Sequence, residues 1–223
     1  MDKQLLKQAL TKFFAGVILM GLLLFLPAGS IAYPGGWLFL GLLFLPMLFL
    51  GVFLLWKAPA LLEKRLSHRE QQTEQKQVVG VSALMFLLGF LLSALDYRLG
   101  WSHVPPVVTG IAAALLLFSY GLYAEVMREN AWLSRTVELQ ENQKVIDTGL
   151  YGIVRHPMYS ATIVLFLSIP LVLGSWIGFV IFLPYPLLLV RRIRSEEELL
   201  EKGLPGYREY KSRVRWRLFP FLW

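Results

Sequence analysis

The stretch from Phe13 to Trp56 contains no charged residue, and this feature constrains the fold most. It is too long for one membrane span, since a helix needs about 20 apolar residues to cross about 30 Å of hydrocarbon. Pro27, Gly29 and Pro34 interrupt it near its middle, which indicates two helices joined by a tight turn. With 56% hydrophobic residues, the chain has more apolar surface than a soluble domain of this size buries. The sequence therefore predicts an all-α, polytopic integral membrane protein.

Three further uncharged runs complete the predicted architecture. Val78–Leu95 and Val104–Ala124 each have about the length of one span. Pro157–Val190 would be about 51 Å long as a single helix at 1.5 Å per residue, so it is expected to fold back around residues 170–175. The total is about six transmembrane helices, and the last two form a C-terminal helical hairpin.

The positive charges predict the orientation. If the chain crosses the membrane six times, all of its 22 Lys and Arg residues except Arg98 fall on one side of the membrane. Because basic loops stay in the cytoplasm, both termini are expected there, in a multi-pass protein of the inner or plasma membrane if the source is prokaryotic. The polar segment 57–77 is expected to be a cytoplasmic amphipathic connector. The first span, with its preceding lysines, also resembles a secretory signal peptide, which is the alternative interpretation.

Composition excludes several kinds of site. The chain has no cysteine, so disulfides, thiolate nucleophiles and Cys-ligated metals are excluded. His68, His103 and His156 are too far apart in sequence to suggest a metal cluster. The basic residues flank the membrane spans, so nucleic acid is not an expected partner.

Three polar segments fall on the predicted cytoplasmic side: 138–151, 155–159 and 192–200. Pro157 suits the first turn of a helix, and the unpaired N–H groups of such a turn favour an anion. Arg192 and Glu196 are four residues apart, so on a helix they share one face. The alternative is structural: Arg155 and His156 are interfacial anchors, and the Arg192 region is a positive-inside anchor that continues into a solvated helix.

Taken together, these segments resemble a known family. The matching residues are Gly149-Leu150-Tyr151, Arg155-His156-Pro157-Met158-Tyr159, Arg192 with Glu196-Glu197 and Leu200, Tyr207-x-x-Tyr210, and Phe219-Pro220. Their ordered combination resembles the prokaryotic-type isoprenylcysteine carboxyl methyltransferases, which are related to the phospholipid N-methyltransferases. The resemblance covers roughly residues 130–220.

The resemblance implies an S-adenosyl-L-methionine-dependent methyltransferase with a cytoplasmic cofactor pocket in a helical membrane fold. By analogy with the family, Arg192 would hold the carboxylate of the substrate, with Arg194 as the alternative because the register beyond the hairpin is ambiguous. The cofactor-binding residues carried over from the family are Gln143, Lys144, Val145, Ile146, Tyr151, His156, Pro157, Met158, Tyr159 and Glu196. The family usually has His at the place of Gln143.

The expected organisation then has two parts. Residues 1–125 form four N-terminal transmembrane helices with the connector 57–77. Residues 126–223 form the methyltransferase core, which consists of the cofactor loop, the hairpin 157–190 and a cytoplasmic C-terminal helix. The expected acceptor is the carboxylate of a lipophilic, isoprenylcysteine-like molecule that reaches the pocket from the bilayer. Methyl transfer to a carboxylate is an in-line displacement that requires positioning and exclusion of water, without a metal.

Other functions stay open at this point. A phospholipid or small-molecule N- or S-methyltransferase is the alternative within the same class. From other classes come a sterol-type membrane reductase that uses NADPH, and a transporter or non-enzymatic membrane protein. The transporter is disfavoured because no ionisable residue lies within any predicted span. The sequence leaves the oligomeric state open.

Overall fold

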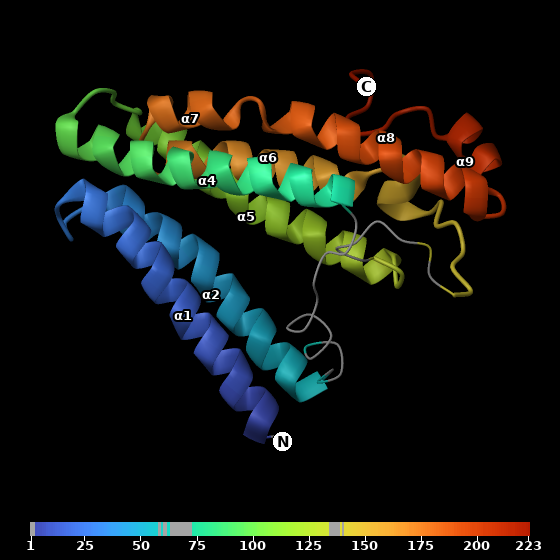
Figure 1. The fold of residues 1–223 in the computed structure, drawn as a ribbon, viewed down its shortest axis with the longest axis horizontal. Helices are drawn as coiled ribbons and strands as arrows, with labels where there is room; N and C mark the ends of the chain where they lie inside the picture. The colour runs from blue at the N-terminus through green and yellow to red at the C-terminus, as the bar shows by residue number, and fades with distance from the viewer. Residues whose placement is uncertain (1–2, 58, 60–61, 63–72, 134–138, 140) are drawn as a thin grey trace. The chain divides into compact units, whose positions relative to one another are not determined.

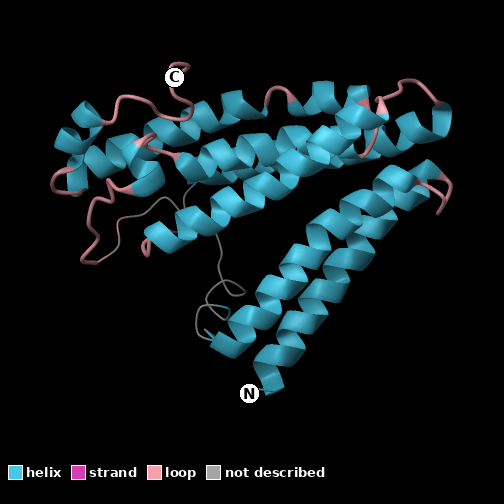
Figure 2. Cartoon of the chain, turned by 180° about the vertical axis from the view of Figure 1, so that it is seen from behind, coloured by secondary structure: helices cyan, strands magenta, loops and turns pink. Residues whose placement is uncertain are grey.

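The described part of the chain is helical. The computed structural model describes residues 3–57, 59, 62, 73–133, 139 and 141–223. Within these residues no strand occurs, as Figure 2 shows. The elements are α1 (Lys3–Ala28), α2 (Pro34–Lys57), α4 (Thr73–Leu99), α5 (Pro106–Glu129), the 3-10 helix η1 (Gly149–Gly152), α6 (Pro157–Val172), α7 (Trp176–Phe182), α8 (Tyr185–Gly203) and α9 (Tyr207–Arg213) (Figure 1). The predicted all-α class is confirmed.

Among the described residues, five helical stretches are long and apolar enough to cross a membrane. They lie in α1, α2, α4, α5 and the combined stretch of α7 and α8. The remaining predicted span, the fifth in chain order, is α6, which has 16 residues and is therefore shorter than the roughly 20 needed for a full crossing. These helices also expose large apolar side chains, among them Leu19 at 70% and Phe49 at 72%. Such surfaces suit a bilayer, so the architecture is that of a multi-pass membrane protein.

The predicted C-terminal hairpin is present, but its second arm is longer than expected. Helix α6 ends at Val172, and Gly174 with φ of 83° makes the turn before α7, inside the predicted segment 170–175. Helix α8 does not stop at Val190 but continues to Gly203. The prediction ended the hairpin where charges begin but expected Arg192 and Glu196 to share a helix, and both lie on α8. Arg and Glu are good helix formers, so charge marks the end of the apolar run and not the end of the helix.

The chain divides into two compact units, which we describe separately. Unit 1 comprises Met1–Arg69, Phe86–Ala113 and Ile169–Ile181, and unit 2 comprises Glu70–Met85, Ala114–Ser168 and Phe182–Trp223. The functional division predicted at residue 125 stays a prediction. Most of the predicted connector 57–77 lies outside the described residues.

Unit 1 is organised around a buried carboxylate. Asp96, in the last turn of α4, is 1% exposed. Its oxygens accept hydrogen bonds from the backbone N–H of Ser102 at 2.6 Å and from the hydroxyls of Ser102 and Ser175, each at 2.5 Å. Nearby, the hydroxyl of Tyr33 donates to the carbonyl of Leu173 at 2.7 Å. The loops that follow α1, α4 and α6 are therefore joined by polar contacts.

Asp96 also corrects a prediction. The third span was expected to end at Leu95, and no ionisable residue was expected within a span. Instead α4 continues to Leu99, and the candidate span Gly80–Leu99 includes Asp96. Because this carboxylate is hydrogen-bonded to serines, it has a structural explanation as a link between loops.

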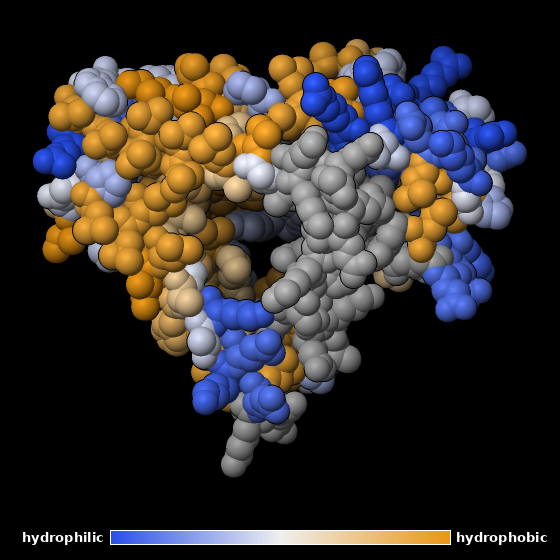
Figure 3. Space-filling model, in the orientation of Figure 1, coloured by the Kyte–Doolittle hydropathy of each residue, from blue (hydrophilic) through white to orange (hydrophobic). Residues whose placement is uncertain are grey.

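Unit 2 contains the polar end of the hairpin. In Figure 3 hydrophilic residues gather over α9 and the C-terminal half of α8. A stripe of residues at a spacing of four, from Tyr185 through Leu189 and Ile193 to Glu197, is buried on α8. The opposite side of the helix carries the exposed Arg191, and Glu198 is exposed on an adjacent face. This amphipathic helix forms one wall of the candidate site.

Candidate functional site

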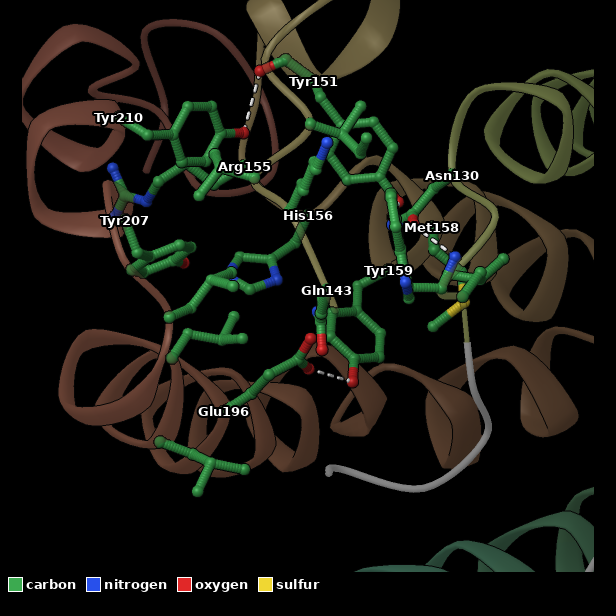
Figure 4. Close-up of a pocket in the computed structure, with 18 of the residues that line it drawn as sticks. Asn130, Gln143, Tyr151, Arg155, His156, Met158, Tyr159, Glu196, Tyr207 and Tyr210 are labelled. Atoms are coloured by element: carbon green, nitrogen blue, oxygen red, sulfur yellow. Dashed lines mark hydrogen bonds between the residues drawn. The ribbon is translucent and has the colours of Figure 1, made fainter. Parts of the chain in front are cut away.

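A pocket in unit 2 gathers most of the predicted site residues. It is a recess with about 860 Å³ of empty space, part of which is open solvent. Its walls come from the end of α5, the loop 143–146, η1, the start of α6, α8 and α9 (Figure 4). The predicted residues on its walls are Gln143, Lys144, Val145, Ile146, Tyr151, His156, Met158, Tyr159, Arg192 and Glu196.

Two predicted residues are not among those that line the pocket, Pro157 and Arg194. Pro157 is the first residue of α6 and is not on the pocket wall. There its ring fits the first helical turn without the loss of a helix hydrogen bond. Its role in cofactor binding stays a prediction. Arg194 is exposed and is also absent from the wall. Of the two arginines considered for the substrate, the structure therefore places Arg192 in the pocket.

A tyrosine hydroxyl connects the two sequence-predicted residues of α8. Arg192 Nε donates to Tyr159 Oη at 2.8 Å, and Tyr159 Oη donates to Glu196 Oε2 at 2.7 Å. The guanidinium also lies 5.9 Å from the centre of the Tyr159 ring, within the range of a cation–π contact. Tyr159 is 6% exposed, so this bridge is shielded from water. The cation and the carboxylate are thus held at fixed positions on one side of the pocket.

A second carboxylate, Glu197, lies behind the wall and was not predicted as a site residue. It is 2% exposed. Its Oε1 accepts from Arg155 Nε at 2.8 Å and lies 3.2 Å from His156 Nε2, while its Oε2 accepts from Arg217 Nε at 3.1 Å. Lys211 lies 3.7 Å from the same oxygen. A buried charge is tolerated when it is paired and hydrogen-bonded, and here several cations surround one anion.

His156 is fixed by this network. The imidazole is 5% exposed and lines the pocket with one side, while Nε2 is directed at Glu197. Its backbone carbonyl accepts from the N–H groups of Tyr159 and Ser160, at 3.0 and 3.2 Å, so it stands at the start of α6 as predicted. The role of His156 in cofactor binding stays a prediction.

The segment after α9 supports the start of α6. The N–H of Arg155 donates to the carbonyl of Trp216, and the N–H of His156 donates to that of Arg217, each at 2.9 Å. Arg155 Nη1 donates to the carbonyls of Val214 and Arg215, at 2.7 and 2.8 Å. Residues far apart in the sequence therefore share backbone hydrogen bonds directly behind the pocket.

The opposite wall depends on a glycine that follows Thr148. Gly149 has φ of 51°, and a Cβ added there would lie 1.3 Å from the carboxylate of Glu129. That carboxylate accepts from the N–H of Leu150 at 3.0 Å. Glycine adopts this conformation without strain, and only glycine permits this close approach to Glu129; the short helix η1 that follows carries Tyr151.

Tyr151 is held at both ends. Its hydroxyl accepts from Asn130 Nδ2 at 2.9 Å, and its carbonyl accepts from Tyr210 Oη at 2.8 Å (Figure 4). Burial raises the pKa of the Tyr151 hydroxyl to about 12, although the hydrogen bond from Asn130 opposes the shift. The hydroxyl is therefore neutral at physiological pH.

Tyr207 differs from these tyrosines. It is 4% exposed and lines the pocket, and its hydroxyl is buried without a hydrogen-bond partner in the described part of the chain. Burial and the negative charges of Glu197 and Glu196 raise the pKa of Tyr207 well above its usual value. It therefore stays protonated and can donate a hydrogen bond.

Several pocket residues were not predicted as such. They are Asn130, Trp132, Leu133, Arg155, Leu199, Leu200, Leu204, Tyr207 and Tyr210, together with Glu197 behind the wall. Glu197 had a usable signal, because it continues the spacing of four after Tyr185, Leu189 and Ile193. Asn130 had none, because its contact with Tyr151 depends on the path of the intervening loop.

Comparison with known proteins gives two findings. A delta(14)-sterol reductase of Mus musculus is 30% identical to this chain over 91 residues, which is 40% of this chain and 22% of the reductase. The matched segment thus spans about a fifth of the length of that relative. Residues 107–205 match the family model of the phospholipid methyltransferases, and that range includes every predicted site residue. The part of the chain that builds most of the pocket is therefore similar to membrane methyltransferases.

Proposed function

We propose that the chain is a membrane-embedded, S-adenosyl-L-methionine-dependent methyltransferase that acts on the carboxylate of a lipophilic, isoprenylcysteine-like acceptor. The observation that carries the proposal is the pocket in which Tyr159 joins Arg192 to Glu196. The match of residues 107–205 to the phospholipid methyltransferase family supports the reaction class. The choice of a carboxylate as the acceptor is inferred from the side chains that line the pocket.

The residues present fit S-adenosyl-L-methionine. This cofactor carries hydroxyls, an ammonium, a carboxylate and a flat base, so a suitable site offers both charges and apolar surfaces. The pocket provides the carboxylate of Glu196, the buried hydroxyl of Tyr207 and the apolar side chains of Val145 and Leu204. A buried hydroxyl without a partner in the described residues is itself typical of a wall that receives a polar ligand.

The chain has to position two reactants and exclude water. When bound, S-adenosyl-L-methionine would supply an activated methyl group that moves from its sulfur to the acceptor oxygen, with S-adenosylhomocysteine as the other product. In this proposal Arg192 orients the acceptor carboxylate, since a guanidinium presents a planar pair of donors to it. Tyr159 fixes the guanidinium through Nε, and Glu196 accepts hydrogen bonds from the cofactor. A carboxylate acceptor needs no general base, so no proton relay has to be assigned.

The membrane setting suits a lipid-tailed acceptor. Helix α8 carries Arg192 and Glu196 in the same candidate span, Trp176–Gly203, whose first half is apolar. A tail can stay in the bilayer while the reactive head enters the pocket. In the predicted orientation, with both termini in the cytoplasm, the pocket opens on the cytoplasmic side, where the cofactor is made.

Two other acceptor or cofactor classes compete with this proposal. The family match favours a phospholipid amine as an alternative acceptor, and the likeness to the mouse sterol reductase favours an NADPH-dependent reductase. An amine acceptor would have to lose a proton, and His156, the histidine on the pocket wall, faces Glu197. This arrangement disfavours the amine.

The test uses purified protein with S-adenosyl-L-methionine labelled in its methyl group and an extract of membrane lipids. We expect a labelled lipophilic product from which mild base releases the label as methanol, as it does from a methyl ester. A base-stable labelled product would identify an amine or thiol acceptor and overturn the carboxylate assignment. In a parallel titration, binding of NADPH without binding of S-adenosyl-L-methionine would overturn the methyltransferase proposal.

A further inference from the structure

The hydroxyl of Tyr207 stands out among the polar groups of unit 2. Its ring belongs to a buried cluster with Leu204, Tyr210 and Val214, against which Val145 and Leu200 pack. The ring is thus held in place by apolar neighbours. Its oxygen is buried and finds no hydrogen-bond partner in the described residues, yet the side chain lines the pocket. In Figure 4 this hydroxyl is directed toward the middle of the labelled side chains.

Tyr210 provides a comparison from the same short helix. It lies three residues further along α9, and the two ring centres are 5.7 Å apart. Its hydroxyl donates to the carbonyl of Tyr151 at 2.8 Å, so it links α9 to η1. The other two tyrosines of the pocket wall, Tyr151 and Tyr159, also have hydrogen-bonded hydroxyls. Tyr207 alone of these four has a buried hydroxyl without a partner among the described residues.

This arrangement costs stability unless a ligand compensates for it. A hydroxyl taken out of water without a hydrogen bond is less stable than a phenyl ring at the same place, so phenylalanine would fill the cluster better. Gly206, with φ of 82°, starts α9 and fixes where Tyr207 enters the cluster. The hydroxyl is therefore best explained by a partner that comes from the pocket.

We propose that Tyr207 is a cofactor-binding residue whose hydroxyl donates a hydrogen bond to an acceptor atom of S-adenosyl-L-methionine. The inference rests on the proposed function for the identity of the ligand. It extends the predicted site to α9, beyond residues 107–205 that match the methyltransferase family. Tyr207 would then join the cofactor site from α9, whereas Glu196 belongs to α8.

The experiment compares Tyr207→Phe with Tyr210→Phe in the full chain, purified in detergent. The probe is S-adenosylhomocysteine, the demethylated product, which binds without turnover. Calorimetric titration gives the Kd, and thermal unfolding without ligand gives the Tm. For Tyr207→Phe we expect a Kd that is roughly three- to tenfold higher, the size of one hydrogen bond, and a ligand-free Tm that is unchanged or higher. For Tyr210→Phe we expect a lower ligand-free Tm, because a bond within the protein is lost.

Three results would contradict this role of the Tyr207 hydroxyl. If wild-type protein binds the probe and Tyr207→Phe binds it equally well, this inference is wrong and the proposed function stands. If Tyr207→Phe lowers the ligand-free Tm as much as Tyr210→Phe does, the hydroxyl is bonded within the protein and the inference is again wrong. If wild-type protein does not bind the probe, the proposed function fails, and with it the assignment of this ligand to Tyr207.

Discussion

Arg155 and Glu197 form an ion pair of 2.8 Å in which each side chain is only 3% exposed. The two residues come from different elements, the segment before α6 and the middle of α8. The pair therefore joins the two ends of the hairpin behind the pocket. Arg155 also donates hydrogen bonds to the backbone carbonyls of Val214 and Arg215. The geometry of the candidate site depends on this buried contact, although neither of its members was predicted as a site residue.

The first prediction concerns this ion pair. Glu197→Gln keeps the shape but removes the charge opposite Arg155, so a buried cation loses its compensation. We expect a loss of about 3 kcal/mol in the free energy of unfolding, the scale for breaking a buried pair. The neighbouring Glu198 is exposed, and Glu198→Gln should change stability by less than about 0.5 kcal/mol. Denaturation of both variants in the same detergent measures the difference. Equal effects of the two changes would contradict the network.

The second prediction separates the two arginines of α8. Arg192→Ala should leave cofactor affinity near its wild-type value and reduce turnover, because the acceptor loses its positioning partner. Arg192→Lys keeps the charge without the planar fork and should recover only part of the activity. Arg194→Ala is the control, since Arg194 is exposed outside the pocket. Steady-state kinetics of the three variants, with cofactor titrations, test this. If Arg194→Ala is the variant that loses turnover, the assignments have to be exchanged.

The third prediction concerns the cofactor side of the same helix. Glu196→Ala removes the carboxylate that accepts from Tyr159 and faces the pocket. We expect S-adenosyl-L-methionine to bind more weakly by about 1–3 kcal/mol, the scale for a hydrogen bond to a charged group. His156→Ala should also weaken binding, and because the imidazole lies against Glu197 it should in addition lower the Tm. Unchanged affinity in both variants would restore the interpretation of this motif as a membrane anchor.

The fourth prediction tests the close approach at Gly149. Gly149→Ala would require a left-handed backbone for a residue with Cβ and would displace the carboxylate of Glu129. We expect a loss of about 2–4 kcal/mol, from the strained backbone and the broken bond to Leu150. Gly100 has φ of 65° with nothing within 4 Å of an added Cβ, so Gly100→Ala should cost only the strain, about 1 kcal/mol. Thermal unfolding compares the two. A Gly149 variant no less stable than the Gly100 variant would refute the clash.

The fifth prediction is topological. If the six predicted helices all cross, residue 99 and residue 223 lie on opposite sides of the membrane, with residue 223 in the cytoplasm. A reporter that is active only in the cytoplasm should therefore be active after Trp223 and inactive after Leu99. The short helix α6 makes this a sharp test, because a half-inserted α6 would change the side of everything after it. If the reporters are both active or both inactive, the predicted number of membrane crossings is wrong.

The long apolar helices were predictable because each is marked by a long run without charges. The turn of the hairpin was equally visible in sequence, from Pro170 and Gly174. The end of α8 was not, because hydropathy reports where the apolar run ends, while the helix continues through Arg and Glu residues to Gly203. For the same reason the third span was ended one residue too early to include Asp96.

The candidate site was predictable where local motifs carry it and not where long-range contacts do. The segment 155–159 and the pair of Arg192 and Glu196 could be placed from the family resemblance. The choice between Glu196 and its neighbour Glu197 depends on helical phase: Glu197 continues the buried stripe, whereas Glu196 faces the pocket. The contacts of Arg155 with Val214 and Arg215 bring together residues about sixty positions apart, and no local pattern encodes them.

The backbone pairing of residues 155–156 with residues 216–217 has a consequence for biosynthesis. The hairpin can enter the membrane as soon as α8 has been translated, but the start of α6 receives these two hydrogen bonds only after residue 217 has left the ribosome. Membrane insertion and completion of the pocket are therefore separate events in time. A nascent chain halted within α9 would already be anchored in the bilayer while the segment carrying His156 still lacked its backbone support.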